Sequence, residues 1–370
     1  MTTNPLVRLG ELGQSPWYDY ITRDLVISGE LRRLIEEDGL RGMTSNPTIF
    51  EKAVAGSRLY DDEIRRLGEA GRSAGEIFEA LAVADVRAAC DEFAALHRAS
   101  GGTDGLVSLE VSPALANDSD GTIHEAERLW SAVDRPNAMI KIPGTRAGLE
   151  AITHCVAAGI NVNVTLLFAV ERYAAVIEAW LDGLERRLQA GEPIGALASV
   201  ASFFVSRVDG RVDPLLDERG DPEGLRGRIA VANACAAYRL FEWSLGSSRW
   251  ARLAKAGAAP QRPLWASTSA KDPRYPDVYY VEALVAPRTV NTLPPETFAA
   301  YRDHGRPAVR IHDGMAAAPA QLRALAGAGI DLGAITEELE HDGVAKFAAS
   351  YRSLLAGIEA KAGALAGARR

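Results

Sequence analysis

The chain has 370 residues, of which 47% are hydrophobic and 24% are charged, and its formal net charge is −8. This balance is ordinary for a soluble globular protein, and no uncharged apolar run reaches the ~18 residues of a membrane span. The negative charge, with no basic stripe to offset it, argues against a nucleic acid partner. No basic segment followed by an apolar one stands at the N-terminus, so we expect a cytoplasmic protein.

Short apolar runs rich in β-branched residues alternate along the chain with longer helical patterns. The runs lie at 16–19, 40–44, 106–111, 138–142, 160–165, 200–205, 263–267 and 289–293, and the helical patterns at 31–38, 74–98, 122–132, 166–189, 223–243 and 297–303. This alternation predicts βαβ units and a parallel sheet in an α/β protein. Eight strands, each followed by a helix, favour a (β/α)8 TIM barrel over an open sheet.

The residues beyond a minimal barrel fall in two places. One is the helical stretch 59–100, after the second strand; the other is a C-terminal extension of about 313–365, with two helices and turns at Gly327, Gly329 and Gly333. We expect one catalytic domain over 1–370 with a barrel core at about 15–305, because no linker or repeat divides the chain. The extra helices either cover a barrel end or form a subunit interface, which leaves a homodimer open.

Residues that bind metals or nucleotides are not arranged in recognisable motifs. The three cysteines, Cys90, Cys155 and Cys235, lie far apart in apolar stretches, which indicates buried thiols. The six histidines are scattered, and neither H-E-x-x-H nor C-x-x-C occurs. No glycine-rich dinucleotide motif or Walker A motif follows a predicted strand. The sequence therefore implies no metal and no cofactor.

Polar residues gather where the predicted strands end. In a barrel these ends face the active site, whereas the interior favours valine, isoleucine and leucine. The residues concerned are Asp19, Thr44, Asn46, Glu110, Lys141, Asn163, Thr165, Ser202 and Ser267. Each unpaired buried polar group costs on the order of 1 to 3 kcal/mol, so packing does not explain this concentration. It predicts an active site at the C-terminal ends of the strands.

Lys141 stands inside the apolar run Met139-Ile140-Lys141-Ile142-Pro143. An isolated lysine in a strand usually faces solvent. Both faces of a parallel barrel strand are covered, however, so this side chain can only point into the barrel mouth. Burial favours the neutral amine, which can attack a carbonyl. Lys141 is therefore the candidate for a Schiff-base lysine.

Asp19 and Glu110 are the carboxylates at the predicted strand ends. Cleavage of a carbon–carbon bond through an imine needs groups that move protons, and these two acids fit that role. Each also has a structural alternative. Asp19 could cap the next helix or pair with Arg23, and Glu110 could form a salt bridge with Lys141.

Five segments resemble motifs of the transaldolase family, in the family's order. They are Thr44-Ser45-Asn46-Pro47-Thr48-Ile49-Phe50, Leu109-Glu110-Val111-Ser112, Ile140-Lys141-Ile142-Pro143, Ile160-Asn161-Val162-Asn163-Val164-Thr165-Leu166-Leu167-Phe168 and Ser202-Phe203-Phe204-Val205-Ser206-Arg207. The resemblance covers about 17–346. It is closest to the longer bacterial branch, whose members carry a stretch like 265–269 and a tail like 329–332.

The resemblance implies transfer of a dihydroxyacetone unit from a ketose phosphate to an aldose phosphate. The donor would be sedoheptulose 7-phosphate or fructose 6-phosphate, and the acceptor glyceraldehyde 3-phosphate or erythrose 4-phosphate. Lys141 would form the imine, and Glu110 with Thr165 would activate the water used in forming and hydrolysing it. Asp19 would take the proton of the C4 hydroxyl and return it to the acceptor.

The resemblance also implies the residues that bind the substrate. Asn46 and Ser202 would hold hydroxyls of the dihydroxyacetone unit, and Phe204 would shield the intermediate from water. Arg207 matches one phosphate-binding arginine. The second arginine, expected just after Ser267, is replaced by Ser269, and Lys271 is the candidate replacement. A lysine binds phosphate as a point charge where arginine offers a fork.

Two rival functions remain open at this stage. A class I fructose 6-phosphate aldolase would use the same lysine to release free products; the phenylalanine at position 204, in place of a hydroxyl-bearing residue, favours transfer. A non-catalytic sugar-phosphate-binding barrel would be expected to lose Lys141, Asp19 or Glu110, and all three are present. The sequence also leaves open whether the enzyme serves the pentose phosphate pathway or the biosynthesis of unusual sugars.

Overall fold

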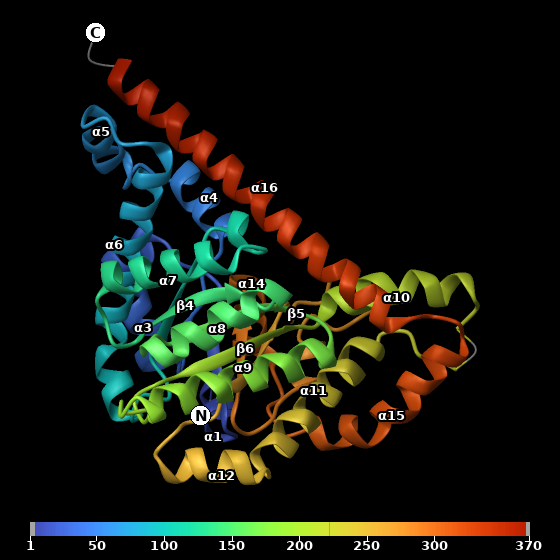
Figure 1. The fold of residues 1–370 in the computed structure, drawn as a ribbon. Coiled ribbons are helices and arrows are strands. Elements are labelled where there is room, and N and C mark those ends of the chain that lie inside the picture. Colours follow the sequence, from blue (N-terminus) through green and yellow to red (C-terminus); the bar gives the residue numbers. More distant parts are fainter. Residues whose placement is uncertain (1–3, 222, 368–370) are drawn as a thin grey trace.

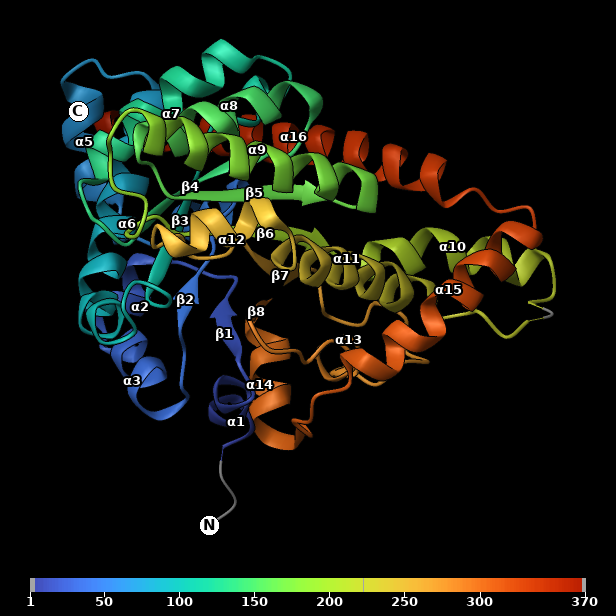
Figure 2. The ribbon, with the colours of Figure 1, turned by 60° about the horizontal axis from the view of Figure 1, so that its bottom comes forward.

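The protein folds as a closed barrel of eight parallel strands surrounded by helices (Figure 1, Figure 2). The computed structural model describes residues 4–221 and 223–367. The strands are β1 Gln14–Tyr18, β2 Gly42–Met43, β3 Leu106–Glu110, β4 Ala138–Pro143, β5 Val162–Leu167, β6 Ser199–Phe204, β7 Arg262–Ala266 and β8 Thr289–Leu293. Each strand pairs with its neighbour in the chain, and β1 closes on β8. The predicted TIM barrel is confirmed.

Helices follow most strands, and additional ones lie where extra length was predicted, after β2 and at the C-terminus. In chain order the helices are α1 Pro5–Glu11, α2 Arg23–Ile27, α3 Glu30–Glu37, α4 Pro47–Gly56, α5 Asp61–Glu69, α6 Ala74–Ala99, the 3-10 helix η1 Pro113–Leu115, α7 Ser119–Val133, α8 Arg146–Ala158, α9 Val170–Gln189, α10 Ser206–Glu218, α11 Ile229–Leu245, α12 Ser248–Lys255, α13 Tyr279–Ala283, α14 Pro295–His304, α15 Ile311–Gly327 and α16 Leu332–Gly367.

The strands that carry the predicted lysine and its neighbours are buried along their whole length. Every residue of β4, β5 and β6 is buried, as expected where helices cover one face of a strand and the barrel interior covers the other. The register pairs Glu110 with Lys141 and Lys141 with Asn163. These three residues therefore lie at the same level of adjacent strands.

Several predicted boundaries were wrong. A helix was expected after each strand, but no specific helical pattern was assigned at the positions of α1, α2, α4, α8, α10, α12 and α13. The helix expected at 166–189 begins only at Val170, because β5 continues to Leu167 through an irregularity in its pairing with β6, where Leu166 has a φ of 61°. Gly333 is not a turn but part of the first turn of α16, which Asp331 caps by accepting a hydrogen bond of 3.1 Å from the backbone N–H of Ala334.

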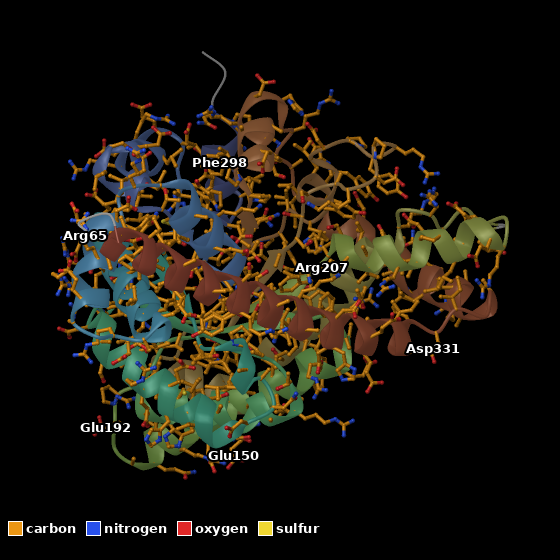
Figure 3. All side chains as sticks on the ribbon, turned by 90° about the horizontal axis from the view of Figure 1, so that it is seen from above. Arg65, Glu150, Glu192, Arg207, Phe298 and Asp331 are labelled. Carbon is orange, nitrogen blue, oxygen red and sulfur yellow. The ribbon has the colours of Figure 1, made fainter. Side chains whose placement is uncertain are left out.

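Helix α16 runs across the molecule as a long diagonal element, and its two ends are fixed to different sides of the barrel (Figure 1, Figure 3). Near its C-terminal end, Lys361 Nζ donates to the carbonyl oxygens of Val54 and Ser57 at 2.9 and 2.7 Å. Nearer its start, Glu340 pairs with Arg172 of α9 at 3.2 Å. The middle of α16 is thereby held over the C-terminal ends of the strands.

The opposite end of the barrel carries a charged cluster, which lines a cavity of about 440 Å³. The Arg262 guanidinium is buried and donates to Ser15 Oγ at 2.8 Å. Ser15 in turn donates to Asp104 Oδ1 at 2.6 Å, and Arg41 reaches Asp104 Oδ2 at 3.1 Å. Burial lowers the pKa of Arg262, and the Asp104 carboxylate opposes that effect. The cluster thus pairs each buried charge with an opposite one.

The cysteines and the long helices have the following surroundings and lengths. Cys90, Cys155 and Cys235 are buried free thiols, as predicted, and burial raises the pKa of Cys155 and Cys235 to about 12. Across residues 4–221 and 223–367, no helix has both the length and the apolar character needed to cross a membrane.

Candidate active site

A cavity of about 430 Å³ opens at the C-terminal ends of the strands. The lining includes every predicted site residue except Glu110, namely Asp19, Asn46, Lys141, Thr165, Ser202, Phe204, Arg207, Ser267 and Lys271. These residues come from strands, loops and helices on several sides of the barrel. The structure therefore brings together side chains that the sequence places up to 252 positions apart, from Asp19 to Lys271.

Lys141 projects from the middle of β4 into this cavity. The residue is only 4% exposed. Its Nζ donates a hydrogen bond of 3.1 Å to the carbonyl oxygen of Ser45, and it lies 3.4 Å from Glu110 Oε2. With one carbonyl and one carboxylate as its polar neighbours, Lys141 also forms part of the cavity lining.

Glu110 lies beside the lysine but is not part of the lining of this cavity. Its side chain is 4% exposed, and neither carboxylate oxygen has a hydrogen-bond partner among the described residues. Burial raises the pKa of Glu110 to about 7; the positive charge of Lys141 opposes the rise and the negative charge of Asp19 adds to it. The structural alternative, an ion pair with Lys141, is present, and it coexists with a carboxyl group that can gain and lose a proton near neutral pH.

Asp19 follows β1 and is held in place by a hydroxyl. Thr44 Oγ1 donates to Asp19 Oδ1 at 2.7 Å, and the same Thr44 hydroxyl lies 2.7 Å from Thr292 Oγ1. Burial raises the pKa of Asp19, while Lys141, the Thr44 hydrogen bond and Arg207 each lower it. The alternative pairing with Arg23 does not occur.

Arg23 instead pairs with two acids on neighbouring helices. Its distances to Asp85 Oδ1 and Glu63 Oε2 are both 2.9 Å. The N-terminus of α2 is capped by Thr22, whose hydroxyl accepts from the backbone N–H of Leu25. Asp19 therefore neither caps α2 nor pairs with Arg23, and it lines the cavity instead.

The remaining polar groups at the strand ends differ in whether they have hydrogen-bond partners in the protein. Thr165 is completely buried, and its hydroxyl has no hydrogen-bond partner among the described residues. Ser202 donates to Asn163 Oδ1 at 2.7 Å, and Asn163 donates in turn to Ser108 at 2.9 Å. Asn46 caps α4 through its side-chain oxygen, which accepts from Ile49 N at 3.0 Å. Asn46 also lines the cavity.

The side of the cavity near β6 and β7 carries an arginine and a strained serine. Arg207 lies in the first turn of α10, with its guanidinium carbon 5.0 Å from the centroid of the Phe204 ring, and burial lowers its pKa. Phe204 packs on Phe168 with centroids 5.2 Å apart. Ser267 has a φ of 56°, a conformation that costs energy for a residue with a side chain, and such strain clusters at functional sites. Ser269 and the exposed Lys271 follow it on the rim.

Several residues of the cavity were missed by sequence reasoning. Phe347 of α16 places its ring centroid 5.7 Å from Lys141 Nζ, and Lys52 of α4, Tyr20, Thr292 and Glu296 also line the wall. Lys52 was missed because no helical pattern was assigned at α4, although Asn46 and Pro47 carried a helix-start signal. Nothing local in the sequence connects Phe347 with β4.

Within the described residues, no group of three or more histidine, cysteine, aspartate or glutamate side chains is placed to hold a metal ion. The cavity holds the amine of Lys141, the carboxyl group of Asp19 and several hydroxyls, and the carboxyl group of Glu110 lies beside the amine. An amine of this kind can add to a carbonyl, and the acids can move the protons that the addition releases.

A closed (β/α)8 barrel with a buried lysine and two acids at its mouth is the arrangement of barrel enzymes that form imines with carbonyl substrates. The model of the Transaldolase/Fructose-6-phosphate aldolase family matches residues 16–358, and the chain belongs to this family. The match covers nearly the whole described chain, including the extension that contains Phe347. The resemblance recognised in the sequence motifs is thereby confirmed.

Relatives of similar length carry the name transaldolase. The protein of Frankia alni is 48% identical over 366 residues, which cover 98% of each chain. That of Acidothermus cellulolyticus is 50% identical over 96% of each chain. A protein of Streptomyces coelicolor named Transaldolase 1 is 47% identical over 96% of this chain and 94% of its own.

Proposed function

We propose that this protein is a transaldolase that carries a dihydroxyacetone unit as an imine on Lys141. The donor is a ketose phosphate, sedoheptulose 7-phosphate or fructose 6-phosphate, and the acceptor an aldose phosphate, glyceraldehyde 3-phosphate or erythrose 4-phosphate. The observation that carries the proposal is the buried Lys141 amine, 3.4 Å from a carboxylate whose pKa is about 7, in a cavity that opens at the strand ends.

The first half of the reaction forms the imine. Lys141 Nζ, once it has given a proton to Glu110, adds to the C2 carbonyl of the ketose and forms a carbinolamine. Glu110 then returns a proton to the carbinolamine hydroxyl, which leaves as water while the C=N bond forms. Thr165, whose buried hydroxyl has no hydrogen-bond partner among the described residues, then holds that water for Glu110.

The second half cleaves and remakes the carbon–carbon bond. Asp19 takes the proton of the C4 hydroxyl, the C3–C4 bond breaks, and its electron pair moves into the iminium to give an enamine. The aldose phosphate departs and another takes its place. The enamine carbon then attacks the new aldehyde, and Asp19 returns the proton to the alkoxide. A carboxyl group whose pKa is raised by burial suits both directions of this transfer.

Binding groups surround the reacting atoms. Asn46 and Ser202 hold the hydroxyls of the three-carbon unit, and Phe204 keeps water from the imine. Arg207, Ser267 and Lys271 bind the phosphate at the far end of the sugar. Arg207 supplies the buried part of this positive charge, and the exposed Lys271 supplies a point charge where related enzymes have an arginine.

We further infer the setting in which the enzyme acts. Sugar phosphates are charged and stay inside the cell, so a cytoplasmic enzyme fits these substrates. A single catalytic domain with α16 as an integral part fits the contribution of Phe347 to the cavity. A homodimer is the assembly we propose, and light scattering over a range of protein concentrations tests it.

Trapping and product analysis together test the function. Incubation with fructose 6-phosphate and borohydride should fix a three-carbon adduct on Lys141, located by peptide mass spectrometry. Adduct on Lys255 or Lys271 in its place contradicts the mechanism. With erythrose 4-phosphate or glyceraldehyde 3-phosphate present, the unit should be transferred, and little free dihydroxyacetone should form. Copious release by the wild-type protein would instead favour a fructose 6-phosphate aldolase, the other activity in the family's name.

The variant Phe204→Tyr separates the two activities further. A hydroxyl at this position can position or activate the hydrolytic water, so the variant should release more dihydroxyacetone than the wild type when no acceptor is present. If Phe204 only packs against Phe168, the ratio of released to transferred product stays constant, and Phe204 then has no part in the chemistry.

A further inference from the structure

Helix α16 brings a second aromatic ring to the reacting amine. The Phe347 ring centroid is 5.7 Å from Lys141 Nζ, and the residue is 7% exposed. Phe204, at the end of β6, and Phe347, on α16, both line the same cavity. Helix α16 crosses over the barrel (Figure 3). The amine thus has aromatic groups from two independent parts of the fold.

Contacts of α16 both before and after Phe347 in the sequence fix the position of this residue. One turn before it, Gly343 packs so closely on the barrel that a Cβ there would come within 2.8 Å of Leu166 Cδ2 and 3.8 Å of an Arg207 guanidinium nitrogen. One turn after it, Tyr351 packs edge-on against Phe78 with centroids 5.6 Å apart. Just before Tyr351, Ser350 accepts a hydrogen bond of 2.8 Å from Thr48. The ring is therefore presented to Lys141 by a clamped helix.

The geometry points to Phe347 as the residue that closes the cavity over the imine, excludes water from it and stabilises its positive charge. This inference rests on the proposed transaldolase function. The face of an aromatic ring attracts a cation, and a protonated imine on Lys141 is a cation that cannot move away. The same ring occupies the volume from which water would approach.

The step that Phe347 suppresses is hydrolysis of the intermediate. After the aldose leaves, protonation of the enamine at C3 gives the iminium of dihydroxyacetone. Water then adds to C2 and loses a proton to Glu110. The carbinolamine expels the amine, which takes up a proton, and dihydroxyacetone is free. Exclusion of this water leaves the enamine to wait for an aldehyde.

Phe347→Leu tests the inference, because it keeps an apolar side chain and removes the ring. The ratio of dihydroxyacetone released to product transferred should rise roughly tenfold, which corresponds to about 1.4 kcal/mol in the barrier to hydrolysis. Borohydride should trap less intermediate at steady state. The rate of imine formation in a single turnover should change little, since the amine and its acids remain.

The matched control is Ile358→Ala, which removes a buried apolar side chain about three turns further along the same helix, outside the lining of the cavity. It loosens α16 comparably but leaves the ring over Lys141. The control should keep the wild-type product ratio. An equal rise in both variants would overturn the specific role of Phe347 and assign the effect to loosening of the helix.

The other outcomes separate this inference from the proposed function. Normal transfer and trapping by the wild type, with an unchanged product ratio in Phe347→Leu, overturns the role of Phe347 alone. Absence of any trapped adduct in the wild type overturns the proposed function itself. If Phe347→Leu does not fold by circular dichroism, Phe347→Met, which refills most of the volume without a ring, carries the same expectation.

Discussion

The two ends of the barrel both contain buried charges, but they satisfy them differently. At the N-terminal end, Arg262, Ser15 and Asp104 form a closed set of hydrogen bonds. At the C-terminal end, both carboxylate oxygens of Glu110 and the hydroxyl of Thr165 have no hydrogen-bond partner among the described residues, and Glu110 keeps only its ion pair with Lys141. Burial makes an unpaired polar group costly, so the C-terminal end, unpaired around Glu110, is organised for a ligand. The charges at the N-terminal end are paired around Arg262, which favours stability, although Gln14 Oε1 and Gln261 Oε1 lack partners there within the described part of the chain.

The largest effect should follow the loss of the amine at the unpaired end. Lys141→Arg keeps a positive charge but cannot form an imine, so we expect turnover and borohydride trapping to disappear. Thermal unfolding followed by circular dichroism should show that the fold survives. Lys271→Arg, on the rim of the same cavity, is the control and should retain the adduct. Measurable transfer by Lys141→Arg contradicts the Schiff-base mechanism.

The next effect concerns the acid that moves the C4 proton. Asp19→Ala should slow carbon–carbon cleavage by ~10²- to 10⁴-fold, the usual contribution of a general acid or base. Imine formation, which depends on Glu110, should be affected much less. Rapid-quench measurement of aldose release beside trapped adduct separates the two steps. Equal slowing of both steps would show that Asp19 acts on imine formation as well.

A change in the Arg262 cluster at the N-terminal end should lower the stability of the protein. Arg262→Met removes the cation and leaves the Asp104 carboxylate with only Arg41, so we expect a loss of about 3 to 5 kcal/mol in the free energy of unfolding. Urea denaturation measures it. The kinetic constants of the folded variant should match the wild type, because the cluster lies at the other end of the barrel from Lys141. If Arg262→Met changed kcat but not the free energy of unfolding, the N-terminal end would serve catalysis and not stability.

The smallest effect is a pH dependence that belongs to the unpaired end. Hydrolysis of the intermediate needs ionised Glu110, so its rate should rise as pH increases through about 7, the raised pKa of this group. Glu110→Gln should lose this rise. The free energy of unfolding changes in the opposite direction, because the folded protein favours the neutral form of Glu110. The contribution of Glu110 to stability is complete below pH 4.5 and is lost as pH rises to about 7. A wild-type pH profile shared by Glu110→Gln would remove Glu110 from the step.

Much of the barrel and the strand-borne part of the site could be predicted from the sequence. Lys141 in an apolar run has only one physically acceptable direction, and its neighbour Glu110 follows from the order of parallel strands. The conformation of Ser267 and the partners of Arg23 could not be predicted, because both depend on loops whose course no periodic pattern specifies. Phe347 could not be predicted either. Its place over Lys141 depends on where a long helix ends and what its flanks bind.

The order of these elements along the chain also sets an order of assembly. All eight strands precede α16, so during synthesis the barrel and its lysine can form before the covering helix has left the ribosome. Until α16 docks, the amine faces the medium without Phe347 above it. A nascent chain paused at that stage would present a nucleophile open to any small aldehyde or ketone in the cell. On the proposed mechanism, docking of α16 would be the event that restricts which carbonyl compounds reach Lys141.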